Sequence, residues 1–523
     1  MKTIELDGES LDLATFEAVV LGKAPVRLAS VARARVDAAR RVVEDILASN
    51  QVAYAITTGV GKLSDVRVSP DENRQLQLNL LRSHAVGVGA PLSESESRGM
   101  MLLRANSLAK GNSGVRAVVI ETLCEMLKRE VHPVIPSQGS VGASGDLAPL
   151  AHLALVLIGE GQAWYRSTRM SGAEAMRAAG IATLTLEAKE AISLINGTQA
   201  MLSCGALALI AARTLVDSAD ALGAMTLEAL KGTKVAMDER IHRARPHAGQ
   251  MESAGNVRRM LEGESAIRES HRDCGRVQDA YSLRCIPQVH GAVRDTLAAA
   301  QRTFEIEMNS AVDNPLVFPG GDAESEARHA SESASASSAG GEVLSGGNFH
   351  GEPVAFALDF LAIALSALAG ISERRTERLV NPNLNEGLPP FLAAGAGLNS
   401  GFMMAQVTAA ALVSENKVLA HPASVDSITT SGNKEDYVSM GMGAAIKLQR
   451  VVENTVQVLT IEALCAAQAM DMLRPLTSTA RVEAVHQRVR DVSTFVEHDR
   501  VLTSDLENVS NLIRRGELAR LMQ

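Results

Sequence analysis

The segment VSMGMGAAIKLQRVVENTVQVLTIEALCAAQAMDM, residues 438–472, decides the fold class of this chain. It continues for more than thirty residues without a proline, and its apolar residues recur with helical spacing. Such a length exceeds that of a typical globular helix and suits a bundle of long helices, or packing across subunits. We therefore predict a mainly α protein with a long-helix bundle at its core.

Other apolar segments have the same helical pattern. Those in the second half of the chain are rich in alanine and cover residues 200–230, 293–308, 353–368 and 402–419. Nearer the N-terminus, helices are predicted over residues 29–48, 98–109 and 147–158, the last with Asp146 as a candidate N-cap. Strand signals are sparse, and the best of them lie at residues 52–57 and 182–186.

This pattern predicts three parts of the chain. Residues 1–200 form a smaller N-terminal α-rich domain, residues 201–475 the long-helix bundle, and residues 476–523 a charged helical cap. One stretch, residues 322–342, is of low complexity and holds six serines among Ala, Glu and Gly. Because it has almost nothing to bury, we predict a mobile surface insertion at about residues 320–344.

Charge and cysteine usage exclude several classes of protein. The chain has 51 Lys and Arg against 60 Asp and Glu, which gives a net charge of -9. It has one Trp, four Tyr and nine Phe, so few aromatic side chains could stack on bases. No nucleic-acid partner is therefore expected. The first residues lack the apolar core of a signal peptide, and no uncharged apolar run reaches about 18 residues, so no membrane span is expected. The five cysteines form no CxxC pair, which favours reduced thiols in the cytoplasm over disulfides or a metal site.

A glycine-rich loop, GSVGASGD at residues 139–146, precedes a predicted helix and so resembles a phosphate-binding loop. No lysine follows its glycines, as the phosphate-loop template requires. Gly61-Lys62 fails the same template, because Ile56 occupies the first glycine position and Leu63 follows the lysine. The GxSxG elbow of hydrolases also fails, since Asp146 stands two residues after Ser144. No bound nucleotide is therefore predicted.

A different chemistry is open to the tripeptide Ala143-Ser144-Gly145 within this loop. The Gly145 nitrogen can approach the Ala143 carbonyl, because glycine has no Cβ to obstruct a tight turn. Cyclisation and loss of water, including the Ser144 hydroxyl, would give a methylidene-imidazolone ring. Such a ring is an electrophile that no ordinary side chain supplies. Three letters alone do not distinguish this outcome from an ordinary turn.

The surrounding motifs make that distinction, because together they resemble the family of histidine and aromatic amino acid ammonia-lyases. The similarity extends over about residues 5 to 515 and includes the loop motif GSVGASGDLAPLAH at residues 139–152. The other motifs are LINGTQ (194–199), QDAYSLRC (278–285), DNPLV (313–317), SGGNFH (345–350), GLPPF (387–391), NSGFM (399–403) and HPASVD (421–426). The resemblance implies a methylidene-imidazolone made from Ala143, Ser144 and Gly145, with no metal.

The resemblance also implies a reaction, the loss of ammonia from an α-amino acid to give a trans-2,3-unsaturated acid. An electrophile that takes up the substrate amine makes it a better leaving group, while the protein supplies a base and holds the substrate. Tyr54 matches the proposed base, and its phenol would need a lowered pKa to act near neutral pH. Arg284 matches the residue that holds the substrate carboxylate.

Further matches surround these two residues in the family's active site. Asn196 and Tyr281 match residues near the electrophile and the substrate amine. Gln278 and Asn314 match polar residues of the pocket, Phe349 an aromatic beside the ring, and Met403 a pocket-wall methionine. The resemblance implies a homotetramer whose active sites are built from several subunits.

Two positions bear on the choice of substrate. His84 and Glu435 stand where histidine-type members of the family carry a histidine and a glutamate. A buried carboxylate gains a charge-assisted hydrogen bond from an imidazole N–H, but facing a phenyl ring it would be desolvated without compensation. These residues predict L-histidine as the substrate and trans-urocanate as the product. Lys434 and Tyr437 depart from the family pattern, which keeps a histidine analogue or another aryl amino acid open.

Two alternatives to this activity remain at the level of sequence. A tyrosine or phenylalanine ammonia-lyase, or an aminomutase, would use the same residues on the same scaffold. A non-catalytic relative is the other alternative, but it would not need to retain Tyr54, Ser144, Asn196 and Arg284 together.

Overall fold

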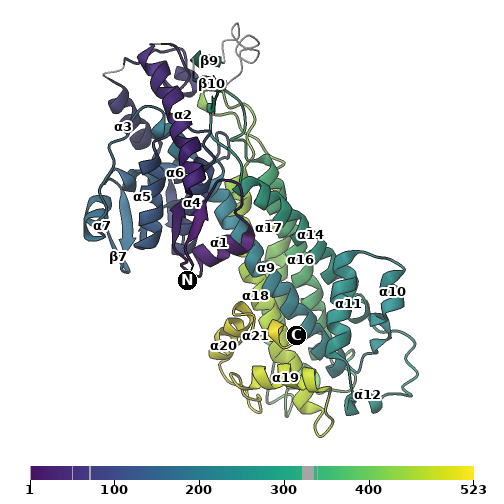
Figure 1. Cartoon of the computed structure of the whole chain (residues 1–523). Helices are drawn as coiled ribbons and strands as arrows, with labels where there is room; N and C mark the ends of the chain where they lie inside the picture. The colour runs from purple at the N-terminus through teal and green to yellow at the C-terminus, as the bar shows by residue number, and fades with distance from the viewer. Residues whose placement is uncertain (1, 50, 70–71, 321–334, 339, 523) are drawn as a thin grey trace. The chain divides into compact units, whose positions relative to one another are not determined.

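The computed structural model describes the whole chain except residues 1, 50, 70–71, 321–334, 339 and 523 (Figure 1). Helices account for 58% of the chain and strands for 8%, which confirms the predicted mainly α fold. The chain forms two compact units, and each is assembled from three separate stretches. Unit 1 contains residues 1–207, 301–358 and 422–446, and unit 2 contains residues 208–300, 359–421 and 447–523. The predicted division at residues 200 and 475 stays a prediction.

The long helices are present and several are longer than the sequence pattern indicated. Most of the segment at residues 438–472 forms α18 (Gly441–Met472), a continuous helix of 32 residues. The others, drawn as continuous ribbons in Figure 1, are α9 (Gln199–Ala229), α14 (Ile286–Met308), α16 (Glu352–Val380) and α17 (Met403–Leu419). Continuous helices of this length satisfy their backbone hydrogen bonds internally, so their buried faces need no other partners for the main chain.

Two of these helices, α9 and α16, are long and apolar enough to cross a membrane by length and composition. Both carry charged side chains, among them Arg213 and Asp359, so neither is an uncharged run. In their most apolar windows 72% of the residues of α9 and 61% of those of α16 are buried inside the protein. Core helices of water-soluble proteins pass the same test, so these two helices are weak evidence for a membrane span.

The rest of unit 1 consists of shorter helices and small sheets. The helices are α1 (Leu13–Val20), α2 (Ser30–Ala48), α3 (Asn73–His84), α4 (Glu94–Ala109), α5 (Ala117–Lys128), α6 (Leu147–Leu157), α7 (Gly172–Ala178) and α8 (Glu190–Ile195). The three predicted N-terminal helices are therefore confirmed as α2, α4 and α6. The parallel pair is β1 (Ile4–Leu6) with β2 (Val26–Leu28), and the antiparallel sheets are β3 (Val88–Pro91) with β5 (Pro136–Gln138), and β4 (Val131–Pro133) with β6 (Gln162–Tyr165) and β7 (Thr168–Ser171).

The two predicted strands are wrong. Residues 182–186 have no regular structure, and residues 54–57 form a turn. In that turn the Thr57 N–H donates to the Ala53 carbonyl at 3.0 Å, and Ala55 adopts a positive φ of 55°. A chain that turns back on itself within four residues cannot pair as a strand. The apolar residues Val52 and Ile56 therefore gave a false strand signal.

The serine-rich insertion is partly a sheet. Residues 322–334 of the predicted mobile loop lie outside the described residues. Its end forms β9 (Ser335–Ser338) and β10 (Gly341–Leu344), which pair antiparallel in a sheet that β8 (Leu316–Pro319) completes. Val343 and Val317 of this sheet pack against Val42, Val43 and Ile46 of α2. The prediction of a mobile loop is therefore wrong for these strands, because an apolar anchor at Val343 holds them.

The rest of unit 2 consists of short helices beside its portions of the long ones. They are α10 (Glu239–Arg243), α11 (Ala248–Met260), α12 (Ala266–Glu269), α13 (Tyr281–Arg284), α19 (Ala480–Arg490), α20 (Thr503–Arg514) and α21 (Glu517–Arg520).

A fully buried ion pair joins two of the long helices within this unit. Arg375 of α16 donates from Nη2 to Glu462 Oε2 of α18 at 2.8 Å. Thr226 and Ser372 donate to the same carboxylate at 2.8 and 2.6 Å.

Glu462→Gln is expected to destabilise the protein strongly, because the amide leaves the buried Arg375 guanidinium without its counter-charge. Removing one partner of a buried pair costs about 3–5 kcal/mol in the free energy of unfolding. The matched control is Glu453→Gln, whose partner Arg514 is 40% exposed and whose loss should cost less than about 1 kcal/mol. Denaturant unfolding of both variants checks this, and equal losses would contradict it.

Candidate functional site

One cavity of unit 1, about 960 Å³ in volume, gathers most of the predicted site residues. The predicted residues that line it are Tyr54, Ala143, Ser144, Asn196, Asn314, Phe349 and Glu435. These residues come from six stretches that are far apart in the sequence. The fold therefore brings the predicted base, the predicted cofactor loop and the predicted substrate-reading carboxylate to one place.

The cofactor loop runs from β5 to α6 and is held closely against residue 197. Gly145 has a φ of +71°, and a Cβ built there would lie 2.2 Å from the Gly197 carbonyl oxygen. The Asp146 N–H donates to that same oxygen at 2.7 Å. Only glycine fits at position 145, both for its backbone conformation and for this close approach. The loop therefore has the sharp, unobstructed turn that ring closure between Ala143 and Gly145 requires.

Asp146 anchors the loop by binding the start of α9 instead of capping α6, so the predicted capping role is wrong. Its Oδ2 accepts from the Ala200 and Met201 N–H groups, each at 2.9 Å, and its Oδ1 accepts from Ser140 Oγ at 2.9 Å. The free N–H groups of a helix N-terminus favour a carboxylate. Complete burial nevertheless raises the pKa of Asp146 to about 6.

A second buried charge, Arg104 of α4, holds the segment on which the loop rests. Its guanidinium donates to the Ser193 carbonyl at 2.7 Å and to the Asn196 carbonyl at 2.8 Å. A Cβ at Gly197 would lie 2.1 Å from Arg104 Nη2, so this glycine makes room for the arginine. Burial lowers the pKa of Arg104 to about 10, which leaves it cationic at neutral pH. The backbone of Asn196 is thereby fixed by the Arg104 guanidinium.

The side chain of Asn196 faces the cavity with one polar atom unused. Asn196 is only 5% exposed, and its Oδ1 has no hydrogen-bond partner. A buried amide oxygen without a donor costs free energy, so such an atom in a cavity indicates a place for a ligand donor. This fits the amine-side role that the resemblance implies for Asn196.

Tyr54 lies at the cavity with its hydroxyl group tied to its own loop. The Gly61 N–H donates to Tyr54 Oη at 3.0 Å, at the start of η1 (Gly61–Leu63). Burial raises the pKa of Tyr54, and the nearby carboxylates of Glu435 and Asp313 raise it further, while the Gly61 N–H acts in the opposite direction. The lowered pKa expected of a base is therefore not a property of this chain by itself.

Glu435 contacts the serine of the predicted cofactor. Ser144 Oγ donates to Glu435 Oε1 at 3.0 Å, and Thr430 Oγ1 donates to the other oxygen, Oε2, at 2.7 Å. Lys434 lines the cavity but is exposed, and Tyr437 stacks on His350 with ring centroids 6.0 Å apart. The carboxylate is thus bonded by two hydroxyl groups, one on each oxygen.

Two predicted residues of unit 1, Gly145 of the cofactor loop and His84, do not line this cavity. His84 lies apart from the loop. It ends α3, and its Nδ1 lies 2.8 Å from the Leu80 carbonyl oxygen and 3.0 Å from Ser83 Oγ. Both contacts are made by Nδ1. Its predicted contact with an imidazole substrate stays a prediction.

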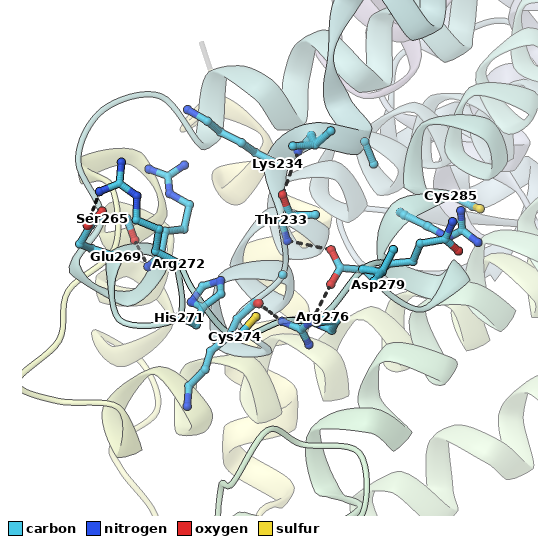
Figure 2. Close-up of a pocket in the computed structure, with 18 of the residues that line it drawn as sticks. Thr233, Lys234, Ser265, Glu269, His271, Arg272, Cys274, Arg276, Asp279 and Cys285 are labelled. Atoms are coloured by element: carbon cyan, nitrogen blue, oxygen red, sulfur yellow. Dashed lines mark hydrogen bonds and ion pairs between the residues drawn. The ribbon is translucent and has the colours of Figure 1, made fainter.

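The remaining predicted residues belong to unit 2. Gln278 and Arg284 line a separate cavity of about 1260 Å³, shown in Figure 2. Arg284 Cζ lies 4.5 Å from the ring centroid of Tyr281, which is 71% exposed, and the Arg284 Nε is buried without a partner. Met403 begins α17 and is half-buried.

Figure 2 also shows how the segment that carries Gln278 and Arg284 is held. Asp279 accepts from the Thr233 N–H at 2.7 Å and lies 3.4 Å from Arg276 Nε. Arg276 in turn donates to Glu386 at 2.7 Å. Within unit 2 these bonds fix the backbone on both sides of Gln278. Arg284 itself is not part of the cavity that holds Ser144.

Three residues of the unit 1 site were not found from the sequence. Thr430, Arg104 and the anchoring role of Asp146 depend on contacts between segments remote in the chain. Only the position of Asp146 directly after the glycine-rich loop gave a signal. Among the residues that the structure describes, no group of three or more His, Cys, Asp or Glu side chains could hold a metal ion.

Comparison with known proteins places this chain among lyases. A family model described as aromatic amino acid lyase matches residues 11–491. A histidine ammonia-lyase of Koribacter versatilis (strain Ellin345) is 67% identical over 519 residues, which are 99% of this chain and 99% of that protein. The crystal structure of histidine ammonia-lyase from Trypanosoma cruzi has a TM-score of 0.89 at 43% identity, covering 100% of this chain and 95% of that one. Tyrosine aminomutase from Streptomyces globisporus has a TM-score of 0.91 at 37% identity, covering 99% and 98%.

Asp146→Asn is expected to impair ring closure in the cofactor loop, because an amide cannot accept from Ser140 and from the start of α9 at once. A displacement of about 1 Å can slow a reaction about 10²-fold, so a large fraction of the purified variant should retain its unmodified mass. Closure should remove two waters, about 36 Da, in intact-protein mass spectrometry.

The matched control for this variant is Asp499→Asn. Asp499 also accepts from two backbone N–H groups, those of Ser400 and Gly401, but on the exposed surface of unit 2. The control should show the full loss of mass. A full loss of mass in Asp146→Asn as well would contradict the anchoring role.

Proposed function

This chain belongs to the aromatic amino acid lyase family, and from that premise we propose that it eliminates ammonia from L-histidine to give trans-urocanate. The observation that carries the proposal is the carboxylate of Glu435, held 3.0 Å from Ser144 Oγ in the cavity that also contains Tyr54 and Asn196. A carboxylate at this point can accept a charge-assisted hydrogen bond from the imidazole N–H of a substrate. The 67% identity to a histidine ammonia-lyase over 99% of both chains supports the same substrate.

The electrophile of this reaction is a methylidene-imidazolone formed from Ala143, Ser144 and Gly145. When formed, this ring takes up electron density from the substrate and so assists the departure of ammonia. The residues fit it: Gly145 makes a close turn against Gly197, and Asp146 holds the loop against the start of α9. The unpartnered Oδ1 of Asn196 is available in the same cavity to accept from the substrate amine.

The remaining residues bind the substrate and move its proton. Tyr54 takes the proton from Cβ, Glu435 accepts from the imidazole N–H, and Arg284 holds the carboxylate in a bidentate pair. Because burial and two carboxylates raise the pKa of Tyr54, the cationic groups that favour its ionised form come from the bound substrate and from other chains.

This division of the site supports a homotetramer with shared active sites. Arg284 and Gln278 line a cavity of unit 2 and are absent from the lining of the unit 1 cavity that holds Ser144, and in this proposal another copy supplies them there. One face of α16 exposes Phe356, Phe360 and Ile363 at helical spacing, with 49%, 62% and 47% of each residue accessible. Such an apolar stripe is suited to burial against a second chain. A cytoplasmic location and no nucleic-acid or membrane partner complete the proposal.

The departures at Lys434 and Tyr437 do not favour another substrate. Lys434 is exposed, and Glu435 is bonded by Ser144 and Thr430 instead. Assays of histidine, tyrosine and phenylalanine side by side test the proposal, because urocanate absorbs in the near ultraviolet. Turnover of tyrosine with none of histidine would replace it with the aromatic lyase or aminomutase alternative.

Ser144→Ala is expected to abolish turnover while leaving assembly intact. Without the serine hydroxyl, the second water cannot be lost and no electrophile forms, so the mass deficit of about 36 Da should be absent. Turnover and intact mass are measured together with the oligomeric state by light scattering. Retained activity would refute the assignment of the cofactor to Ser144.

Glu435→Gln is expected to reduce histidine turnover more than any residual turnover of tyrosine or phenylalanine. The loss of one charge-assisted hydrogen bond corresponds to about 1.5–3 kcal/mol, or about ten- to hundredfold in kcat/KM for histidine. The three amino acids are compared in wild type and variant, with intact mass confirming that the cofactor is present. Equal losses for all three would mean that Glu435 does not read the ring.

A further inference from the structure

We propose that Thr430 is a positioning residue for histidine turnover, which holds one oxygen of the Glu435 carboxylate so that the other faces the cavity and the substrate ring. This inference rests on the proposed function, because the group that Thr430 orients is the one that reads the imidazole. None of the family motifs quoted above includes Thr430. The role follows from how the two oxygens of Glu435 are shared.

The carboxylate has two different partners, one for each oxygen. Thr430 Oγ1 donates to Oε2 at 2.7 Å, which is within the range of a strong hydroxyl–carboxylate bond, and Ser144 Oγ donates to Oε1 at 3.0 Å. Because the terminal torsion of glutamate is broad, the carboxylate plane needs a second partner to be fixed. Formation of the proposed ring removes the Ser144 hydroxyl, and Thr430 then remains as the partner that holds the carboxylate.

The backbone keeps the hydroxyl of Thr430 at this oxygen. The Thr430 N–H donates to the Glu435 carbonyl at 2.9 Å, and the two residues form an isolated antiparallel bridge. Between them, η5 (Ser431–Asn433) closes the turn with positive φ angles of 51° at Ser431 and 67° at Asn433. Non-glycine residues are held in such conformations only by surrounding structure. The turn therefore holds Thr430 and Glu435 side by side at its two ends.

The same turn is connected to the cofactor loop and lies against the loop of Tyr54. Beyond Glu435, the Met440 N–H donates to the Val141 carbonyl at 2.8 Å, and Ser439 Oγ donates to the Gly142 carbonyl at 3.1 Å. At the tip of the turn, a Cβ on Gly61 would lie 3.2 Å from Ser431 Oγ. With both ends of the segment fixed in this way, the side-chain torsions of Glu435 are its main remaining freedom. Thr430 removes that freedom.

The test compares Thr430→Val with Thr430→Ser. Valine keeps the shape of threonine without the donor, and serine keeps the donor. Thr430→Val is expected to lower kcat/KM for histidine about tenfold or more, as expected for losing a hydrogen bond to a charged group. Thr430→Ser is expected to stay within about threefold of wild type, which is a small difference on the same scale. Both variants should show the full mass deficit of the mature cofactor.

A double-mutant cycle shows whether Thr430 acts through Glu435. In the Glu435→Gln background, adding Thr430→Val is expected to change kcat/KM for histidine by less than about twofold, because the group to be oriented is already altered. The control is Ser427→Ala, which removes a different hydrogen bond of the same segment, from the Val438 N–H, and should leave histidine turnover near that of wild type. A merely structural role of Thr430 would add its loss in either background.

Three outcomes separate this inference from the proposed function. Failure of wild type to turn over histidine, with its cofactor present, would overturn the proposed function. Histidine turnover by wild type together with full activity of Thr430→Val would overturn the positioning role alone. A loss in Thr430→Val that serine does not rescue, or that persists in the Glu435→Gln background, would also overturn it.

Discussion

The site in unit 1 depends on one buried carboxylate, that of Asp146, bound at the start of α9. Its two oxygens join three donors from two segments, Ser140 on the loop and the Ala200 and Met201 N–H groups on the helix. The electrostatic match between a carboxylate and a helix N-terminus offsets part of the cost of burial, and the raised pKa of about 6 records the part that is not offset. In return for that cost, the Asp146 carboxylate fixes the position of the loop that carries Ser144.

Other buried charges around the loop also hold backbone segments at a cost in desolvation. Arg104 fixes the carbonyls of Ser193 and Asn196, and Lys189 pairs with Asp313 at 2.6 Å, next to Asn314 of the cavity. Buried charges contribute little net stability compared with apolar packing, but removing one partner is costly. They therefore hold backbone segments in single arrangements. If the loop closes into the proposed ring, it gains from such rigidity, since closure requires near-attack geometry in the folded chain.

The sequence predicted what depends on local pattern or on fixed motifs. Helical periodicity located α2, α4, α6 and the long helices, and the motifs placed Tyr54, Ser144, Asn196 and Glu435 in one cavity. It failed at residues 52–57, because a turn of apolar residues and a strand have the same composition. It failed at Val343, because one buried side chain within a polar stretch decides whether strands form. Thr430 and Arg104 had no signal, since their partners are set by tertiary contacts that no local window contains.

The surroundings of Tyr54 in this chain oppose the role of base proposed for it. A base near neutral pH needs a phenol whose ionised form is favoured, yet burial and the charges of Glu435 and Asp313 favour the neutral form. The same carboxylate that suits an imidazole thus opposes the base. The opposition is relieved if positive charge enters the cavity only with the substrate amine and with the arginine of another copy. Tyr54 would then become a competent base only when the assembled site is filled.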